Sequence, residues 1–530
     1  MTPPQARFAG MTPCIRDRAI AQRVCPGSRL LVLLLGVIQL GALPAGRTAA
    51  AAAPLQADPA PLVQELSNLE AQIRQRARPV SLDQAVAQGI RANPQLQQAF
   101  AAIQQYEWQL IAAQRQWYPN LQLTNGTPFA GVQWQSFSQT YSFTSPTAPP
   151  TYSNSSQLFV FQPGVSINWN FLDPTRQPNI NAAAQSLRQQ KLLFDVSARN
   201  LILDIQQSYY SLQASRELID SFRRIYAINQ QQLAMLEAQR SIGMNTVLDV
   251  EATRSQLFAQ LNQLVGYIRS YIEQAASLAA TMALPEDQLA IPSELAALRG
   301  DWELSLEQTI QQARRQREEI LASLAAAESA RWSSVAAIRS YLPVFGLVAN
   351  GNLITNQGPQ RTQNGGFNTN VDTSLTNGTA AIGVGFNWML FDGGIQAANA
   401  QAAKAQALQQ TAQSASTDLQ VIQQVRASFG RLRTARVAYI SAQQAYRSAE
   451  LGQAAARARF AVGVGDITSV VQTIQQLSEA TEQMAAATLS YNTALAQLYR
   501  YSATWPDQTQ PAVQQRLQQL RRAPDASARP

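Results

Sequence analysis

A strand that runs directly into a very long helix is predicted twice in this sequence, and it limits the folds open to the chain. The two copies are segments 168–173 (Asn-Trp-Asn-Phe-Leu-Asp) and 387–392 (Asn-Trp-Met-Leu-Phe-Asp). Before each aspartate, apolar residues alternate with small or polar ones, which indicates a strand with one apolar face. The residues that we expect to form the turn and start the helix at these joints are Asp173, Asp392, Gly393 and Gly394.

The helices that follow the joints are unusually long. Residues 179–242 contain neither glycine nor proline, so a single helix there would reach roughly 95 Å at about 1.5 Å per residue. A glycine turn follows at Gly243, and another at 463–466. After each turn, apolar residues recur at alternating steps of three and four, from 247 to 278 and from 467 to 498, which is typical of a coiled coil. The two patterns match at a constant offset, so we infer an internal duplication.

The duplication suggests a division of the chain into six segments. We expect a signal peptide with a long basic lead at 1–51, a linker with a short helix at 52–80, a first repeat at 81–284, a connector at 285–304, a second repeat at 305–504 and a disordered tail at 505–530. Each repeat is predicted to hold a helix, a β-hairpin, a long helix, a turn and a coiled-coil helix. The hairpins are expected at about 120–171 and 344–391, with loops at 144–156 and 355–379.

The N-terminal segment has the character of an export signal. Several arginines precede the apolar run 30–40, and a small-residue tract follows, so we expect cleavage near Ala51. The alternative is an uncleaved anchor, but the apolar core is shorter than the ~20 residues of a comfortable membrane span. Because Cys14 and Cys25 are the two cysteines of the chain, the processed protein would carry no thiol.

Composition argues against catalysis and against nucleic acid as a partner. The chain has no histidine, the commonest general base and metal ligand, and it contains no phosphate-binding loop. Its net charge of +8 comes from arginines scattered along helices beside glutamine, not from a basic cluster. We therefore predict no enzyme activity, no metal, no cofactor and no nucleic-acid binding.

Two hairpins supply only four strands per chain, and four strands cannot close a barrel. Open strand edges cannot face lipid, because their backbone groups would stay unpaired. The smallest membrane barrels have about eight strands, so the chain must oligomerise. Three copies would supply about twelve strands and two copies would meet the minimum, so this argument leaves the copy number open.

The chain resembles the TolC family of outer-membrane efflux proteins over nearly all of the mature sequence. The resemblance rests on paired Ser-Leu-Asp/Glu-Gln helix starts at 81 and 305, the prolines that end the next helices, the two strand-to-helix joints and the two glycine turns. It implies a mainly α fold with membrane β: duplicated long-helix coiled-coil units that form a trimeric α-helical barrel, topped by a shared twelve-stranded β-barrel. It also implies a place in the outer membrane with the helices projecting into the periplasm, and partnership with outer-membrane lipid, a periplasmic adaptor protein and an inner-membrane pump or ABC exporter.

In that family, helix ends close the periplasmic mouth, with acidic residues just after the helical turns. Asp249 occupies this place after the first turn, and it is equally open to interpretation as an acid that stabilises a helix start. The second half departs from the family pattern, because it carries Ser469 and Gln472 there, with Asp466 closer to the turn. We interpret Gly243, Gly463 and Gly465 as turn formers near the expected adaptor contact. Trp169 and Trp388 are either membrane-interface residues or packing between protomers.

The leading functional hypothesis is a passive outer-membrane conduit of a tripartite efflux pump or type I secretion system, gated at the periplasmic helix ends. The first alternative is a structural trimeric coiled-coil envelope protein or adhesin, which the two matched hairpins oppose. The second is a periplasmic adaptor, which has one helical hairpin where this chain has two long helix pairs.

Overall fold

The computed structural model describes residues 59–140, 151–364, 367–505, 514–515 and 517–519. The expected signal peptide at 1–51 lies outside these residues, as does most of the tail after 505. Within that tail, 514–515 and 517–519 are helical, and Leu517 is buried in a core cluster with Leu82 and Tyr209. This short stretch therefore packs on the core, where disorder was expected.

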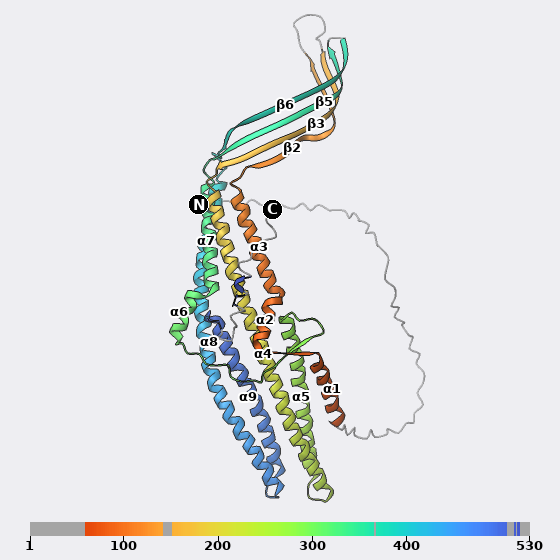
Figure 1. Cartoon of the computed structure of the whole chain (residues 1–530), viewed down its shortest axis with the longest axis vertical. Helices are drawn as coiled ribbons and strands as arrows, with labels where there is room; N and C mark the ends of the chain where they lie inside the picture. Colours follow the sequence, from red (N-terminus) through yellow and green to blue (C-terminus); the bar gives the residue numbers. More distant parts are fainter. Residues whose placement is uncertain (1–58, 141–150, 365–366, 506–513, 516, 520–530) are drawn as a thin grey trace, which may run out of the picture. The chain divides into compact units, whose positions relative to one another are not determined.

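The described chain consists of long helices, a pair of short strands and a sheet of long strands (Figure 1). The helices are α1 (Pro59–Arg76), α2 (Leu82–Ala92), α3 (Pro94–Arg115), α4 (Arg176–Ser241), α5 (Val247–Thr281), α6 (Leu306–Gln316), α7 (Glu318–Arg339), α8 (Ile395–Ala461) and α9 (Ile467–Tyr501). The strands are β1 (Ala77–Val80), β2 (Asn120–Thr140), β3 (Thr151–Leu172), β4 (Leu289–Pro292), β5 (Val344–Asn364) and β6 (Phe367–Asn387). The series helix, helix, strand, strand, long helix, helix thus occurs twice, with long helices of 66 and 67 residues.

The same local signal begins both series. Ser81 Oγ accepts a hydrogen bond from the backbone N–H of Gln84, whose side chain accepts one from the backbone N–H of Ser81, at 3.3 and 3.2 Å. Ser305 and Gln308 form the same reciprocal pair at 3.2 and 3.0 Å. These capping boxes satisfy N–H groups that the first helical turn leaves without partners, so the sequence fixes where α2 and α6 begin.

The four long strands form one antiparallel sheet in the order β2-β3-β5-β6. Residues 151–156 and most of 355–379 belong to its strands, although their polar composition predicted loops. Backbone pairing along the whole ladder stabilises these segments independently of side-chain polarity. β6 ends at Asn387, opposite Val344 where β5 begins, so residues 388–391 have no strand to pair with, although the predicted hairpin included them.

The predicted linker and connector are joined by backbone pairing. The linker holds α1, a helix of 18 residues, and then β1. β1 pairs in parallel with β4 of the connector, with Ala77 opposite Leu289 and Val80 opposite Pro292. This small sheet ties the segment before the first repeat to the segment between the repeats.

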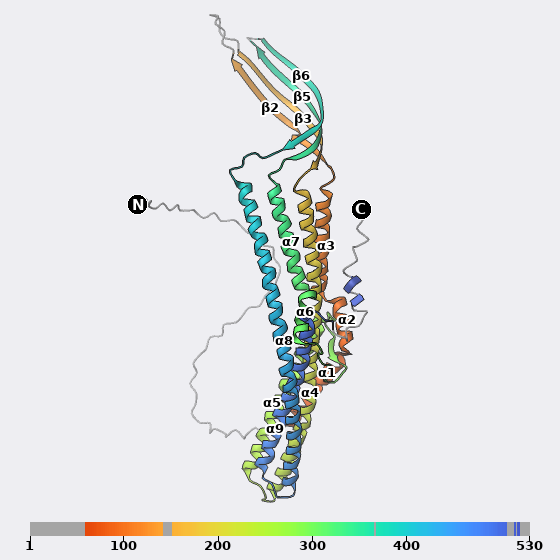
Figure 2. The same cartoon turned by 90° about the vertical axis from the view of Figure 1, so that its left-hand side faces the viewer.

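The helices that carry the turns pack as two coiled pairs. α4 packs on α5, α8 packs on α9, and the pairs meet through α4 and α9. The lower part of Figure 1 accordingly shows the order α8, α9, α4, α5, α1 from left to right, and Figure 2 shows both turns at the end away from the sheet. Leu257 and Leu261 of α5 and Ile474 and Leu477 of α9 are buried in one shared cluster, as the three-and-four spacing predicts. Val247 is exposed because it lies at the turn, before the helices are in contact.

Candidate functional site

The turns between the long helices are built by the same backbone motif. Gly243 and Gly463 have φ of 78° and 77°, a left-handed conformation that only glycine adopts without strain. In the first turn the N–H of Met244 donates to the carbonyl of Gln239 at 2.9 Å, and the second turn has the equivalent bond at 3.1 Å. This is a Schellman motif, which satisfies the carbonyls at the end of the helix. Both glycines therefore end a helix, as their position in the sequence indicates.

Gly465 has a different requirement, which the first turn does not share. A Cβ at this position would lie 3.0 Å from the backbone nitrogen of Phe460, closer than side chains normally approach. The N–H of Gly465 also donates to the carbonyl of Arg459 at 3.1 Å. The second turn is thus folded more tightly onto the end of α8, whereas the first turn has Asn245 in the matching place.

The helix starts after the two turns are capped differently. Thr246 caps α5, and its hydroxyl and backbone N–H donate to Asp249 Oδ2 at 2.6 and 3.0 Å. Asp466 is the capping residue of α9, but its side chain makes no capping hydrogen bond. Asp249 is therefore held in a capping box, and Asp466 is left exposed.

The environment of Asp249 keeps its carboxylate ionised. The hydrogen bonds from the Thr246 side chain and then from its backbone lower the pKa of Asp249, and burial opposes them only slightly. A negative charge at this place also suits the positive end of the α5 dipole. Ser469 and Gln472 are exposed on α9. Asp466 is the only acid between Gly463 and Gln472.

The turns also present a set of exposed apolar side chains, which we call the tip residues. They are between 55% and 76% exposed, and what is informative is that several apolar side chains are exposed at one end of the helices. The tip residues are Ile242, Met244, Val247, Leu248, Val462 and Val464. Sequence reasoning singled out the glycines and missed these neighbours; the signal that could have found them is an apolar residue on both sides of each turn glycine.

The strand-to-helix joints have structural roles. Asp173 Oδ1 accepts from the backbone N–H of Thr175 at 2.9 Å, and Asp392 accepts from those of Gly394 and Gln396 at 2.9 and 2.7 Å. Gly393 and Gly394 have φ of 69° and 90°, which the tight turn before α8 requires. Each aspartate therefore satisfies backbone groups where a long helix begins.

The tryptophans at the joints form an equivalent pair. Trp169 Nε1 donates to the carbonyl of Trp117 at 2.9 Å, and Trp388 Nε1 donates to the carbonyl of Tyr341 at 3.0 Å. In each repeat, this bond ties the returning chain to the end of the shorter helix that precedes the strands. Both rings remain partly exposed, at 38% and 52%. The shared contact shows that the duplication extends to side-chain interactions.

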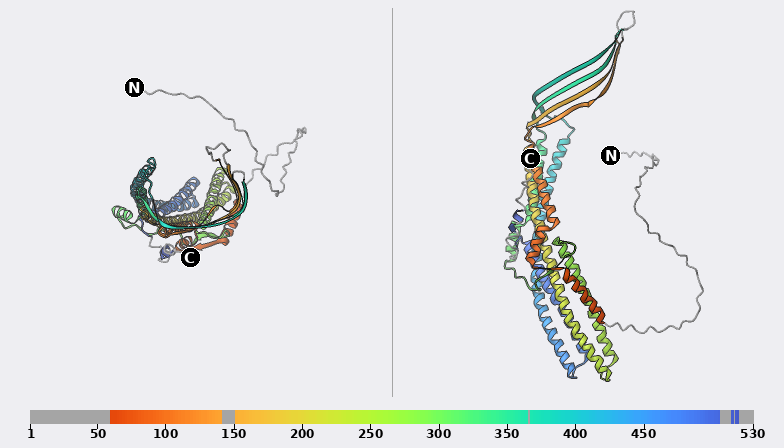
Figure 3. Two further views of the ribbon diagram at one scale, coloured as in Figure 1. Left: turned by 90° about the horizontal axis from the view of Figure 1, so that it is seen from above. Right: turned by 45° about the vertical axis from the view of Figure 1, so that its right-hand side comes forward.

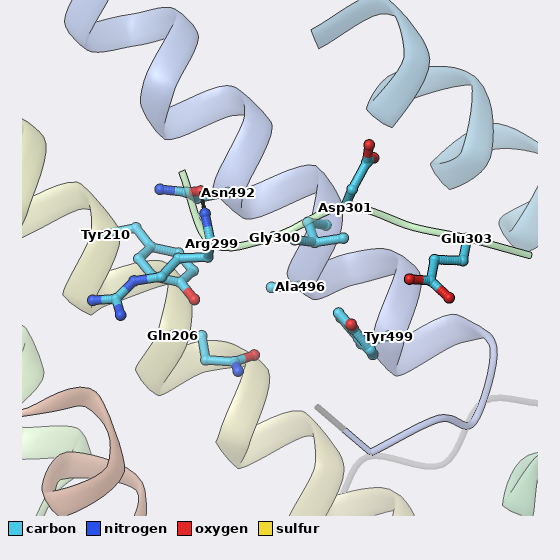
Figure 4. Close-up of a pocket in the computed structure, with 10 residues that line it drawn as sticks. Gln206, Tyr210, Arg299, Gly300, Asp301, Glu303, Asn492, Ala496 and Tyr499 are labelled. Carbon is cyan, nitrogen blue, oxygen red and sulfur yellow. Dashed lines mark hydrogen bonds between the residues drawn. The ribbon is translucent and has the colours of Figure 1, made fainter. Parts of the chain in front are cut away.

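A polar hollow of about 240 Å³ lies where the connector crosses α4 and α9 (Figure 4). The backbone N–H of Arg299 donates to Asn492 Oδ1 at 3.1 Å, and the Asn492 amide donates to the carbonyl of Ala297 at 2.8 Å. Tyr491 donates to the carbonyl of Gly300 at 2.7 Å. These bonds hold the connector against α9. On the α4 side of the hollow, burial raises the pKa of Tyr210 to about 12.

Other kinds of site were sought in the part of the chain that the structure describes. No group of three or more acidic, cysteine or histidine side chains there is arranged to hold a metal ion. None of the described helices has an apolar stretch of the length that a membrane crossing requires.

Solved outer-membrane channels share this fold. The structure matches the CmeC channel of Campylobacter jejuni with a TM-score of 0.64 at 15% identity, over 84% of this chain and 90% of that one. It matches VceC of Vibrio cholerae with a TM-score of 0.61 at 16% identity, over 80% and 96% of the two chains. It matches the open-state MtrE channel of Neisseria gonorrhoeae with a TM-score of 0.60 at 16% identity, over 81% and 90%. No curated protein sequence matches the chain.

The sequence itself matches the family described as outer membrane efflux protein over residues 86–284 and 309–504. The chain therefore belongs to this family, and the resemblance to TolC-family channels is confirmed. It is an outer-membrane channel protein whose helical part lies in the periplasm. α1, which ends at Arg76, lies outside the matched residues.

Proposed function

We propose that this protein is the exit duct of a tripartite efflux pump or of a type I secretion system. In this proposal it is a homotrimer that gives cargo a passive path from the periplasm to the exterior, with outer-membrane lipid around its strands. A periplasmic adaptor links it to an inner-membrane pump or ABC exporter. Membership of the efflux protein family supports this general role.

The observation that carries the proposal is the open sheet. β2 and β6 form its edges, and neither has a second strand partner within the described chain. Exposed apolar side chains alternate along both edges, at Leu121 and Leu123 on β2 and at Ile382, Val384 and Phe386 on β6. An alternating apolar face suits lipid, but unpaired strand edges do not, so strands of further copies are required to close the sheet.

Three copies would supply twelve strands, enough for a closed barrel above the minimum of about eight. In the same trimer, the six helical turns would meet at the periplasmic end. The tip residues would then form an apolar rim there, which is the kind of surface that the helical hairpin of an adaptor could cover. Gly243, Gly463 and Gly465 shape this rim and are the candidate residues nearest to the adaptor contact.

The test of this function is conductance. The purified, processed protein is expected to migrate as a trimer in detergent and to insert ion-conducting pores into planar lipid bilayers. The variant Ile382→Asp/Val384→Asp serves as the matched control, because aspartate on the lipid-facing side of β6 opposes insertion. A well-folded protein that stays monomeric in water without detergent would disprove the proposal.

The periplasmic mouth is the proposed gate. Three copies of Asp249 would bring three ionised carboxylates close to one axis, and a ring of carboxylates attracts cations. The capping role of Asp249 fixes the position of its carboxylate and does not conflict with this second role. Asp466, Ser469 and Gln472 are the further candidates for the constriction, all exposed on the same end of α9.

Replacing Asp249 with asparagine tests the gate. We expect the cation preference of the pore to fall and block by polyvalent cations to weaken, because the ring loses its charge while the side chain keeps its size. Reversal potentials in a salt gradient measure the first effect, and conductance with added trivalent cations measures the second. The control is Glu251→Gln, which removes a carboxylate two residues away that pairs with Arg254. If both variants keep the selectivity and block of the original protein, Asp249 is not at the constriction.

A further inference from the structure

An apolar groove lies between α1 and α5, on the side of the helices away from α8. Its volume is about 490 Å³. Figure 3 shows α1 lying along α5, and Leu62 and Leu69 of α1 and Val265 of α5 remain 41% to 43% exposed. The groove is lined by the apolar residues Leu62, Leu66, Leu69, Leu261 and Val265 and by the polar residues Glu65, Asn68 and Gln72 of α1. Exposed apolar surface of this kind often marks a site where another molecule binds.

α8 carries two stripes of residues at coiled-coil spacing, and only one of them is covered. Val421, Val425, Leu432 and Ala435 belong to the stripe that is buried against neighbouring helices. The second stripe steps by three and four along the opposite side, and all its members are exposed. We call it the open stripe of α8; its members are Val437, Ile440, Gln444, Arg447 and Leu451.

The apolar members of the open stripe make it a face for packing. Val437, Ile440 and Leu451 are 68%, 57% and 72% exposed. A repeat of three and four residues is the spacing by which one helix packs along another. The open stripe of α8 is therefore a coiled-coil packing face that no described element covers.

The groove and the open stripe lie at opposite ends of one row of helices. The row runs α8, α9, α4, α5, α1 (Figure 1), so a second copy placed beside the first brings α8 of one against α5 and α1 of the other. Val265 follows the turn residue Gly243 by 22 positions, and Ile440 precedes Gly463 by 23. At about 1.5 Å per residue, both lie roughly 35 Å from their turns, so the groove and the stripe are level.

Opposite charges lie on the two surfaces. Glu65 on the groove and Arg447 on the open stripe both lack an ion-pair partner among the described residues. One helical level higher, Glu273 follows Gly243 by 30 positions, and Arg433 precedes Gly463 by 30. Glu273 already pairs with Arg269 of its own helix at 3.9 Å, so Glu65 and Arg447 are the opposite charges that the contact would bring together.

We propose that the groove between α1 and α5 binds the open stripe of α8 from a second copy of this chain. α1, which precedes the family-matched residues, then acts as a clasp over each seam between neighbouring protomers. The contact joins two different surfaces, so it repeats around a closed ring. The inference rests on the proposed oligomeric channel, and adds which elements form the seam and what α1 contributes.

Paired cysteines test the clasp. The variant Leu69→Cys/Ile440→Cys places one thiol in the groove and one on the stripe at the same level. The matched control is Leu69→Cys/Leu408→Cys, because Leu408 is exposed on the same helix but lies 32 residues from Ile440, about 48 Å along α8. A disulfide requires Cα atoms within about 7 Å, so only the first pair is expected to link. Both variants and the three single-cysteine proteins are purified in detergent, oxidised and separated on a denaturing gel without reductant.

The expected result is that most chains of the first variant run as reducible products of two and three linked chains, while the control and the single variants stay monomeric. Products that stop at two chains would contradict a ring of unlike surfaces, as would equal linking in the control. If the first variant stays monomeric but forms conducting pores, the clasp is wrong and the channel function stands. If it neither links nor conducts, while the unmodified protein also fails to conduct, the proposed function fails with it.

Discussion

Replacing Glu319 with alanine is expected to destabilise the helical part of the protein by about 3 kcal/mol, because two buried arginines lose their counter-charge. Glu319 Oε2 lies 3.1 Å from Arg317 Nε, and Glu319 Oε1 forms an ion pair with Arg500 Nη2. The arginine side chains are only 4% and 5% exposed, so water cannot replace the missing carboxylate. The ion pair between Glu319 and Arg500 joins α7 to the end of α9. Its loss would therefore loosen the contact between two helices of the second repeat.

The same ion pairs make stability depend on pH. Burial alone would raise the pKa of Glu319, but the charges of Arg500 and then Arg317 outweigh burial and lower the pKa from 4.5 to about 2. A carboxylate with a lowered pKa contributes stability that is complete above its unfolded pKa and is lost as the pH falls toward its folded pKa. The melting temperature of the original protein should therefore fall between about pH 4.5 and 2, and more steeply than that of Glu319→Ala.

A control on the same helix separates this effect from a general loss of charge. Glu328 of α7 pairs with Arg331 at 3.5 Å, but the side chains are 37% and 74% exposed. Exposed pairs of this kind contribute about 0 to 1 kcal/mol, so Glu328→Ala should melt close to the original protein. Equal melting temperatures for Glu319→Ala and Glu328→Ala, measured by loss of helical circular dichroism, would show that the buried pair does not stabilise the fold.

Much of the helical architecture could be predicted because local signals mark it. Glycines such as Gly243 and Gly463 end the long helices through left-handed turns, and capping boxes such as that of Ser81 begin others. Apolar residues at coiled-coil spacing then show which face of each helix is buried. These signals act within a few residues, so a single sequence contains them.

The length of the strands could not be predicted in the same way. Residues 355–364 and 367–379 are rich in Asn, Gln, Gly and Thr, which are ordinary loop residues, yet they continue β5 and β6. Their position in the sheet depends on backbone bonds to a neighbouring strand, such as the pairing of Thr355 with Thr376. Side-chain composition carries little information about such bonds when the strand packs on no protein core.

The electrostatic interior could not be predicted either, because its partners are far apart in the chain. Arg500 and Glu319 are separated by 181 positions, and Arg199 and Glu318 by 119. No periodicity links residues at such distances, so only the packed structure shows that they meet. At the turns, by contrast, sequence reasoning placed Asp249 at a helix start correctly, but it could not show that Thr246 binds its carboxylate.

Two leucine-to-alanine substitutions on α5 should separate an effect on stability from an effect on partner binding. Leu257→Ala is expected to cost about 2 to 5 kcal/mol, because Leu257 is 1% exposed and its removal leaves a cavity in the cluster shared with Leu236 and Ile474. Leu248→Ala, nine residues earlier, should change stability by less than about 0.5 kcal/mol, because Leu248 is 76% exposed. Thermal melting of the purified oligomer measures both.

Leu248→Ala should instead weaken the contact with the proposed adaptor by about tenfold or more, since an apolar anchor at the centre of an interface contributes at least about 1.4 kcal/mol. A photoreactive side chain placed at 248 in living cells should capture a periplasmic adaptor, and one placed at the buried position 257 should not. Pull-down of the captured adaptor by each alanine variant then gives the change in affinity. If Leu248→Ala binds the adaptor as well as the original protein does, the tip residues are not the docking surface.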